Sequence, residues 1–451
     1  MGTFMRKKTA IIGGGAAGLF ACCQLKNLAS KQGVETDIVI YEKESSLGRK
    51  LLLTGHGRCN LTNAKEPREL KKAYHEAGNF IYPAISEFTP FDTMKFASEV
   101  LGLELVEQEN NRIFPASEKS SDVLDAILKY IESDGNVEIR LNTKVLGLMR
   151  IDYDSDNFGR IVVATESGED IYDSVILATG GKSFSKTGSD GSGFEIASKA
   201  GHNIVPLHAG LSPVKVTPED REFTGHLSGL SVNANAGLYI SGRKSASEEG
   251  DVLFTHEGLS GPAIMELSRY IPSELPEDDE NFIELDFVSH MRDEELDKSL
   301  IAEINSHPDT KLTNLATSYV PKSLAEELAE KIMNDASEKE CSEIKTVLGR
   351  AEVTKLKDLP GKNITGLIRK KYSQKLKHLE LHLDGAPDLE TAYVTVGGVS
   401  TDEIDRKTMM SSKIENLYII GEMLDVDGKS GGYNLQACMS EAYLAVKSII
   451  G

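Results

Sequence analysis

The first forty residues alternate between the apolar spacing of strands and that of a helix. The short apolar run 9–12 is typical of a buried strand, the glycine-rich stretch 13–18 interrupts it, and residues 19–28 have the length and apolar pattern of a helix. The apolar run 37–42 then has the composition of a second buried parallel strand. This order predicts one βαβ unit at the start of the chain.

Later changes in the pattern predict that this fold is interrupted. Turn-separated strands with little helix begin near residue 204, and charged amphipathic helices dominate residues 294–354. A strand at 416–421 followed by a helix at 432–450 then restores the βα pattern. More local predictions are helices at 92–101, 121–133 and 323–333, and a hairpin made of 161–166 and 171–177.

The order of these segments predicts an α/β fold in three parts, and the length of 451 residues also indicates about three domains. One α/β domain is expected to form from both ends of the chain, because the βα pattern returns only at the end. The predicted parts are an α/β domain of residues 1–200 and 390–451, a β-rich insert of 201–290 and 355–389, and a small helical insert of 291–354.

The composition limits the range of partners. The chain is 40% hydrophobic and 27% charged, with a net charge of −20. An acidic surface repels phosphate backbones and anionic lipid headgroups, so we expect a small-molecule substrate, no nucleic acid and no membrane. No uninterrupted apolar run reaches 18 residues, and a cytoplasmic location is predicted. The sequence gives no indication of the oligomeric state.

The five cysteines have neither metal-binding nor dithiol spacing. Cys22, Cys23, Cys59, Cys341 and Cys438 form no CxxC motif, so no metal site is predicted. Their sparse and odd number fits a reducing cytosol. Cys59 lies in a glycine-rich loop, where a small buried packing role is expected.

A glycine motif is the first feature that carries chemistry. Residues 13–18 satisfy G-x-G-x-x-G between a predicted strand and helix, and Glu42 lies 24 residues beyond Gly18 at the end of the next strand. The first glycine permits a tight turn, the second lets the backbone approach a pyrophosphate, and the third lets the helix pack closely on the strand. The Glu42 carboxylate would accept hydrogen bonds from ribose hydroxyls. These features predict dinucleotide binding.

Two further segments favour FAD as the dinucleotide. The loop 48–60 is punctuated by glycines and carries three cations, so it could wrap an extended cofactor. Near the other end, a strand ends in Gly421 and Glu422, and the segment 427–435 opens the last helix. The N–H groups and positive dipole end of that helix would suit the N1/C2=O edge of a flavin, which becomes anionic on reduction.

Together these segments resemble the HI0933-like (BaiN/aminoacetone oxidase-like) family of FAD-dependent oxidoreductases. The resemblance covers essentially the whole chain in family order and implies a discontinuous Rossmann-type FAD-binding domain, a β-barrel-like insert and a small helical insert. One departure is His56, where many relatives have glycine. The resemblance rests on residues 13–18, 48–63, 178–181, 258–262 and 421–436.

The resemblance also implies how the cofactor is held. The glycine motif would face the pyrophosphate and Glu42 the adenosine ribose, while the backbone of Val145 would lie at the adenine. Residues 178–181 would cross beneath the dinucleotide. The implied cofactor-binding residues are Gly13, Gly15, Ala16, Ala17, Gly18, Glu42, Lys43, Arg49, Lys50, Gly57, Arg58, Cys59, Asn60, Val145, Ala178, Thr179, Gly180, Gly181, Gly421 and Glu422 (ribityl chain), and Gly432, Tyr433, Asn434 and Leu435 (isoalloxazine).

The sequence does not assign the catalytic residues. Because a flavin itself carries the hydride, the protein needs only to bind the substrate, orient it, exclude water and place a proton donor nearby. His256, Tyr433 and Arg58 are the candidates for that donor.

Three functions stay open on this basis. The first is an FAD-dependent oxidoreductase acting on a small organic substrate, with NADH or NADPH as a transient electron donor. The second is a flavin oxidase that uses oxygen, and the third is a non-catalytic flavin-binding sensor. Residues 189–193 also resemble fumarate reductase-like flavoproteins, which keeps ene-reduction among the options. The net charge and the lack of a basic run longer than three disfavour a tRNA-modifying flavoprotein.

Overall fold

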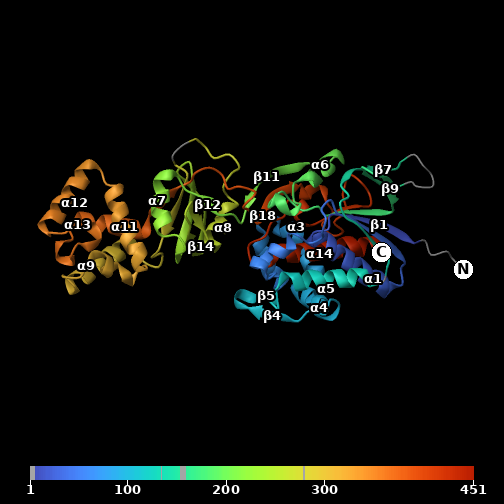
Figure 1. Ribbon diagram of the computed structural model, residues 1–451, viewed down its shortest axis with the longest axis horizontal. Helices are drawn as coiled ribbons and strands as arrows, with labels where there is room; N and C mark the ends of the chain where they lie inside the picture. The colour runs from blue at the N-terminus through green and yellow to red at the C-terminus, as the bar shows by residue number, and fades with distance from the viewer. Residues whose placement is uncertain (1–5, 134, 153–158, 278–279) are drawn as a thin grey trace. The chain divides into compact units, whose positions relative to one another are not determined.

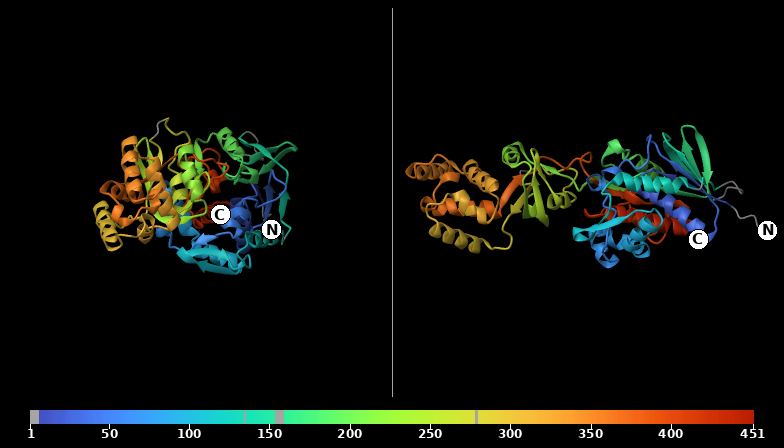
Figure 2. Two further views of the ribbon diagram at one scale, coloured as in Figure 1. Left: turned by 60° about the vertical axis from the view of Figure 1, so that its left-hand side comes forward. Right: turned by 60° about the horizontal axis from the view of Figure 1, so that its bottom comes forward.

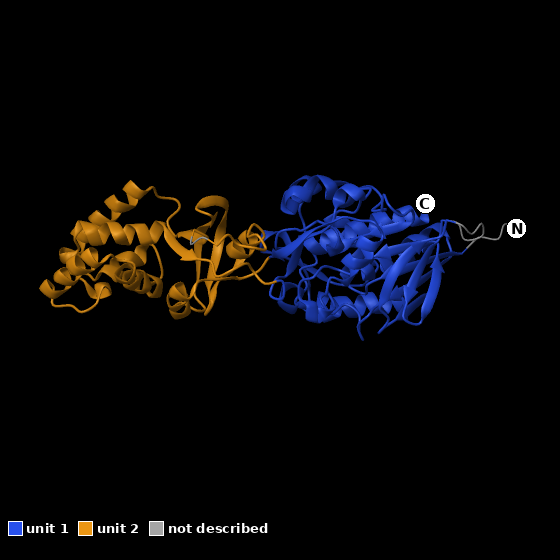
Figure 3. Ribbon diagram, turned by 90° about the horizontal axis from the view of Figure 1, so that it is seen from above, with its two compact units in different colours: residues 1–210, 389–451 blue, residues 211–388 orange. Residues whose placement is uncertain are grey.

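The computed structural model describes residues 6–133, 135–152, 159–277 and 280–451. The chain forms two compact units (Figure 3). Unit 1 consists of residues 1–210 and 389–451, and unit 2 of residues 211–388. In the sequence, unit 2 is therefore an insertion between two parts of unit 1.

A five-stranded parallel sheet forms the centre of unit 1. Its strand order is β19-β10-β1-β2-β6, and each neighbouring pair is parallel. The C-terminal part of the chain thus supplies one edge strand of a sheet that the N-terminal part begins. The strands are β1 (Lys7–Ile12), β2 (Thr36–Tyr41), β6 (Val137–Arg140), β10 (Ser174–Leu177) and β19 (Leu417–Ile419).

The helices α1 (Ala16–Gln32) and α14 (Tyr433–Ile450) contact each other in the core of unit 1 (Figure 1). Leu19 of α1 and Val446 of α14 are both fully buried, as helices that cover a parallel sheet require. The predicted βαβ unit is confirmed. The first helix is longer than predicted and ends at Gly33, which caps it in the left-handed conformation (φ 67°).

The predicted hairpin is wrong in its second half. β8 (Ile161–Thr165) pairs with β9 (Gly168–Tyr172), but the strand predicted to reach residue 177 breaks at Asp173. The Asp173 carboxylate accepts a hydrogen bond from the N–H of Lys8 (2.8 Å), and the Asp173 N–H donates to the Lys8 carbonyl (2.9 Å). These bonds take the chain from the small β7-β8-β9 sheet into the central sheet.

The remaining elements of unit 1 surround these sheets. The helix predicted at 92–101 begins earlier because Thr89 caps it: the Thr89 hydroxyl accepts a hydrogen bond from the N–H of Asp92 (3.2 Å). The elements are β3 (Thr62–Asn63), β4 (Leu105–Gln108), β5 (Arg112–Pro115), β7 (Val145–Arg150), β11 (Ile204–Gly210), β18 (Val394–Val399), α2 (Pro67–Leu70), α3 (Gly78–Glu87), α4 (Pro90–Glu99), α5 (Ser120–Glu132), α6 (Ser192–Lys199), and the 3-10 helices η1 (Leu51–Gly57) and η2 (Lys71–Ala77).

Unit 2 contains a six-stranded antiparallel sheet with the order β12-β15-β14-β13-β16-β17. An antiparallel bridge between Val216 and Leu383 joins its two edges, so the sheet curves back on itself like a barrel. The strands are β12 (Val214–Lys215), β13 (Ser231–Ile240), β14 (Arg243–Phe254), β15 (Gly258–Ser260), β16 (Phe282–Asp286) and β17 (Leu379–His382).

The helices of unit 2 lie beside this sheet, and one hydrophobic core runs through both (Figure 2, right). The three-part division of the chain stays a prediction, since the sheet and the helices share that core. Helix α13 packs on α9 and α11 although it follows residue 354. No helix among the described residues has both the length and the apolar character needed to cross a bilayer. The helices are α7 (Pro218–His226), α8 (Pro262–Ser268), α9 (Asp293–Ser306), α10 (Leu312–Leu315), α11 (Lys322–Asn334), α12 (Glu338–Arg350) and α13 (Gly366–Lys377).

Candidate functional site

A groove opens in unit 1 at the carboxyl ends of β1 and β2, the edge at which open parallel sheets bind ligands. The predicted cofactor-binding residues that line it are Gly13, Gly15, Glu42, Lys43, Arg49, Lys50, Val145 and Thr179. The lining also contains polar and glycine residues that are not among the predicted cofactor-binding residues: Gly14, Ser46, Gly48, Thr143, Lys144, Thr187, Gly188, Ser189 and Ser192.

The three glycines of the motif have different surroundings. A Cβ atom on Gly13 would lie 2.4 Å from the carbonyl oxygen of Ala178, and one on Gly18 would lie 2.0 Å from the carbonyl oxygen of Gly13. A Cβ atom on Gly15 would meet nothing within 4 Å. Gly13 and Gly18 thus permit close backbone packing, while Gly15 faces open space at the start of α1, where a pyrophosphate fits.

The backbone orients Glu42 at the edge of this groove. Its carboxylate accepts hydrogen bonds from the N–H groups of Gly14 and Glu44, both at 2.8 Å. The carboxylate is therefore held beside the glycine turn, at the end of β2, where a ribose of a bound dinucleotide would lie. This position fits the predicted role of Glu42.

Cations also line the groove. Lys43 forms an ion pair with Asp190 at 2.5 Å, and Arg49 pairs with Glu44 and donates to the carbonyl oxygen of Lys186 at 2.7 Å. Burial would raise the pKa of Asp190, but hydrogen bonds from Lys43 and Ser192 outweigh it and lower the pKa to about 2. These partners fix the cations beside the groove as suitable neighbours for phosphate oxygens.

Hydrogen bonds join the two ends of the chain beside the groove. The Lys50 ammonium group bonds to the Glu422 carboxylate at 2.8 Å and to the Ser183 hydroxyl at 2.7 Å. The Thr395 N–H also donates to Glu422 at 2.8 Å. Tertiary structure thus places predicted residues from both ends together, and it adds Ser183 and Thr395, for which the sequence carried no signal.

Close backbone packing places Gly421 against the glycine motif. A Cβ atom on Gly421 would lie 2.6 Å from the Cβ atom of Ala17 in α1, and the φ of Gly421 is 71°. A Cβ atom on Gly181 would likewise lie 2.6 Å from a carboxylate oxygen of Glu422. Glycine is therefore required where β10 and β19 end beside α1.

The start of α14 is built by predicted residues. The Asn434 side chain accepts from the N–H of Gly428 and donates to its carbonyl oxygen, both at 2.8 Å, which closes the preceding loop. Asn60, with its amide oriented to satisfy its neighbours, accepts from the N–H of Gly432 at 3.1 Å. The first N–H groups of the helix point out of its end, so the loop can present them to a bound group.

The candidate proton donors lie in different surroundings. The Tyr433 hydroxyl accepts a hydrogen bond from Lys65 (3.0 Å), and the Arg58 guanidinium stacks 4.6 Å from the ring centre of Phe114. His256 is exposed in a turn of unit 2, whereas the groove belongs to unit 1. Cys59 is fully buried, and burial raises the pKa of its thiol to about 11, although a hydrogen bond with Thr54 opposes the rise.

Glu441 in α14 is a buried group that the sequence analysis missed. Its carboxyl accepts a hydrogen bond from the N–H of Gly421 at 2.6 Å, and the side chain is fully buried. Burial raises the pKa of Glu441 to about 8, and the Gly421 N–H opposes only part of that rise. The sequence signal that could have identified Glu441 is that it is the single acidic residue of the apolar last helix.

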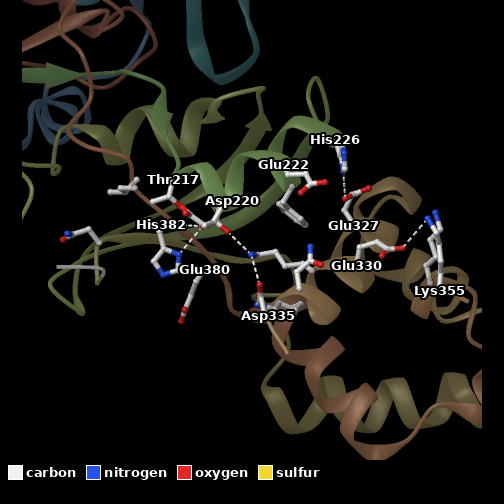
Figure 4. Close-up of a pocket in the computed structure, with 18 residues that line it drawn as sticks. Thr217, Asp220, Glu222, His226, Glu327, Glu330, Asp335, Lys355, Glu380 and His382 are labelled. Atoms are coloured by element: carbon white, nitrogen blue, oxygen red, sulfur yellow. Dashed lines mark hydrogen bonds and ion pairs between the residues drawn. The ribbon is translucent and has the colours of Figure 1, made fainter. Parts of the chain in front are cut away.

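A second cavity, of about 1090 Å³, lies between the sheet and helices of unit 2 (Figure 4). At its base the Asp220 carboxylate accepts hydrogen bonds from the Lys331 ammonium group and from the backbone N–H of His382, both at 2.8 Å. Burial would raise the pKa of Asp220, but these donors lower it. The buried charges neutralise each other and link α7 to α11, while the bond from His382 ties α7 to β17.

The open parallel sheet, the glycine turn at the start of α1 and the groove that joins both chain ends define a Rossmann-type FAD-binding oxidoreductase. Residues 7–448 match the family model described as the HI0933-like protein Rossmann domain, and the chain belongs to that family of FAD-dependent oxidoreductases. The resemblance that the sequence motifs indicated is therefore confirmed.

Three characterised relatives match nearly the whole chain. Two are named "ribosomal RNA dihydrouridine synthase", from Haemophilus influenzae (30% identical, 97% of this chain and 97% of the relative) and from Escherichia coli (30%, 98% and 97%). The third is the 3-dehydro-bile acid delta(4,6)-reductase of Clostridium scindens (27%, 97% and 98%).

Solved flavoenzyme structures align with most of this chain at low identity. The fumarate reductase subunit FrdA of E. coli is 12% identical, with a TM-score of 0.45 and coverage of 98% of this chain and 70% of that one. The 3-ketosteroid delta1-dehydrogenase of Sterolibacterium denitrificans is 14% identical, with a TM-score of 0.47 and coverage of 98% and 99%.

Proposed function

We propose that this protein is an FAD-dependent reductase of a carbon–carbon double bond conjugated to a carbonyl group in a ring. The similarity to the three full-length relatives carries the proposal. A dihydrouridine synthase saturates the ring of uracil, and a reductase of a 3-dehydro steroid acts on double bonds near a ring ketone. Both substrate rings present the same group to a hydride donor, an alkene activated by a carbonyl.

The groove of unit 1 would hold the FAD. Gly13, Gly15 and the start of α1 would bind the pyrophosphate, Glu42 the ribose, and Lys50 and Glu422 would lie along the chain to the flavin. Bound FAD supplies hydride transfer. The residues of the chain bind and orient the reactants and exclude water. Tyr433 and Arg58 stay candidate proton donors, and NADH or NADPH, docking transiently, is the proposed source of electrons.

For the substrate we propose a uracil base of ribosomal RNA, which the names of the two relatives at 30% identity support. A basic segment, residues 65–72, adds to this support. Its cations Lys65, Arg68, Lys71 and Lys72 pair with no carboxylate among the described residues. Lys65 bonds to Tyr433 at the start of α14, so the basic segment lies beside the proposed flavin site. Such cations would contact a phosphate backbone.

This proposal departs from the expectation drawn from net charge. The value of −20 is a sum over the whole chain, whereas a phosphate backbone responds mainly to charge within about 8 Å at physiological salt. Residues 49–72 contain seven Lys or Arg residues and two Glu residues, so this stretch is basic although the chain is acidic.

The test uses purified protein, an unmodified ribosomal RNA transcript and NADH or NADPH without oxygen. We expect bound flavin to bleach on addition of the nicotinamide and a uridine of the RNA to gain two hydrogens, detected by mass spectrometry of its nucleosides. If a steroid enone gained two hydrogens and RNA did not, the substrate would be a small molecule and not RNA. Peroxide formation without a nicotinamide would favour an oxidase, and flavin that no donor reduces would favour a sensor.

A charge variant sharpens the RNA part of the test. The double substitution Arg68→Gln and Lys72→Gln removes two exposed cations of the basic segment. Affinity for the transcript should fall and its dependence on salt should become weaker, because fewer counterions are released. Lys31→Gln, which removes an exposed cation at the end of α1, should change neither. Equal effects of both variants would contradict a specific role of the basic segment.

A further inference from the structure

Three ring side chains of unit 1 form an aromatic cluster: His56, Phe184 and Tyr393. The ring centres of His56 and Tyr393 are 6.2 Å apart, and those of Tyr393 and Phe184 are 5.3 Å apart in a T-shaped arrangement. His56 is exposed, and Phe184 and Tyr393 are only partly buried. Ring faces are therefore available at the surface.

The three residues of the aromatic cluster are close in sequence to partners of Glu422, a carboxylate tied to the groove through Lys50, which lines it. His56 belongs to η1, which begins directly after Lys50, and Phe184 follows Ser183. Tyr393 precedes Thr395 by two residues. Lys50, Ser183 and Thr395 all bond to the Glu422 carboxylate. Since Glu422 is the residue proposed for the ribityl chain, the rings flank the place expected for the flavin.

The backbone of the aromatic cluster is strained. His56 has φ 58° and Phe184 has φ 51°, both in the left-handed region that side chains other than glycine rarely adopt. Gly55 and Gly57 on either side of His56 are also left-handed, with φ 57° and 82°. Strain of this kind persists where the surroundings enforce it, and it gathers at ligand-binding sites. A glycine at position 56 would release it, so the imidazole is retained against a cost.

Other groups at the aromatic cluster are arranged for a ligand. Among the described residues the His56 ring nitrogens bond to no side chain or backbone group, so an N–H remains able to donate to a ligand oxygen. Leu52 and Leu53 of η1 are 36% and 42% exposed, which adds apolar surface beside the imidazole. A flat, partly apolar ring with a carbonyl oxygen matches this combination of stacking faces, apolar surface and one donor.

We propose that His56, Phe184 and Tyr393 are specificity-determining residues that bind the substrate ring by stacking, with the His56 N–H donating to a ring carbonyl oxygen. The inference rests on the proposed function and names the residues that recognise the uracil base. A base presented from single-stranded RNA stacks on aromatic faces. The saturated ring of dihydrouracil is puckered and stacks poorly, so the aromatic cluster would also favour release of the product.

The test measures binding of a fluorescently labelled short oligouridylate to the FAD-loaded protein by anisotropy, without turnover. His56→Gly and Tyr393→Leu should each weaken binding on the order of tenfold, because each removes one stacking face. His56→Gly should also raise the melting temperature, because it releases left-handed strain. A purely structural His56 would give a lower melting temperature and unchanged binding. The matched control is Phe91→Leu, an exposed aromatic of α4, which should change neither.

The outcomes separate this inference from the proposed function. Wild-type protein that binds the oligouridylate, with both variants binding it equally well, would overturn the assignment of the aromatic cluster and leave the function standing. Wild-type protein that keeps its FAD but neither binds the oligouridylate nor modifies RNA would overturn the RNA substrate and the assignment with it. An oligonucleotide of dihydrouridine that binds as tightly as oligouridylate would refute the stacking argument.

Discussion

Each unit contains a fully or nearly fully buried carboxyl group, and the two behave in opposite ways. Asp220 in unit 2 has a lowered pKa, because the Lys331 ammonium group and the His382 N–H outweigh its burial. Glu441 in unit 1 has a pKa raised to about 8, because burial outweighs its single bond from Gly421. Burial alone therefore does not set the charge of a carboxyl group; the donors within reach do.

The different charge states of the two carboxyl groups fit their different surroundings. In unit 2 a compensated ion pair joins α7 to α11 without needing a ligand. In unit 1 the carboxyl group lies beneath Gly421, at the end of β19 beside the groove. A neutral Glu441 adds no negative charge there, whereas an ionised one would repel the phosphates of a dinucleotide. Four substitutions, at Lys331, Glu441, Gly15 and Asp190, test these differences.

The largest effect is expected from Lys331→Met, which leaves the Asp220 charge buried without its partner. The side chains of Asp220 and Lys331 are only 4% and 11% exposed, so the loss should be about 3–5 kcal/mol in the free energy of unfolding. Urea unfolding followed by circular dichroism measures it. Lys355→Met, which removes an exposed partner 4.0 Å from Glu330, should cost less than about 0.5 kcal/mol. Similar costs would show that Asp220 is not compensated as described.

Glu441→Gln is expected to stabilise the protein in a pH-dependent manner. The carboxyl group binds its proton more tightly in the folded state, with a pKa of about 8 against an ordinary 4.5. The contribution of this carboxyl group to the free energy of unfolding is thus complete below pH 4.5 and is lost as the pH rises towards 8. Glutamine stays neutral, so the variant should gain on the order of 3 kcal/mol at pH 7 and nothing near pH 4.5. Unfolding curves across this range test it, and a gain independent of pH would contradict it.

Gly15→Val should abolish cofactor binding without unfolding the chain. Gly15 has an extended backbone (φ −81°, ψ −172°) that valine accepts, and its Cβ direction is open. The new side chain would occupy the space proposed for the pyrophosphate, and FAD affinity should fall by more than about 100-fold, or 2.7 kcal/mol. Fluorescence titration of the apoprotein with FAD measures this. Gly147→Val, also in open space, is the control, and equal FAD affinity of both variants would refute the placement.

The smallest effect is expected from Asp190→Asn. The pKa of Asp190 is lowered to about 2, so its contribution to stability is present above about pH 4 and is lost as the pH falls towards 2. The side chain is 45% exposed and screened by solvent, so the contribution should stay below about 1 kcal/mol. The variant should therefore be slightly less stable than the wild type at pH 7, and this difference in the free energy of unfolding should shrink as the pH falls towards 2. A difference that is constant with pH would contradict the Lys43 pairing.

The local periodicity of the chain was enough to predict the βαβ unit, the glycine turn and the return of the fold at the end. A strand or helix pattern depends on neighbours a few residues away, and the G-x-G-x-x-G spacing by itself indicates a tight turn between a strand and a helix. The resemblance to the HI0933-like family came from the same short motifs, and the family model confirms it. The strand predicted at 171–177 failed because the break at Asp173 depends on Lys8, a residue far away in the sequence.

Which distant residues meet depends on the tertiary structure. Lys50 and Glu422 are 372 residues apart, and Asp220 and Lys331 are 111 apart, so no window of sequence contains either pair. The same holds for the aromatic cluster, whose rings come from three segments that are far apart in the sequence. Charge state follows the same division. The sequence supplies the carboxyl groups of Asp220 and Glu441, but the pKa of each depends on burial and donors that exist only once the chain has folded.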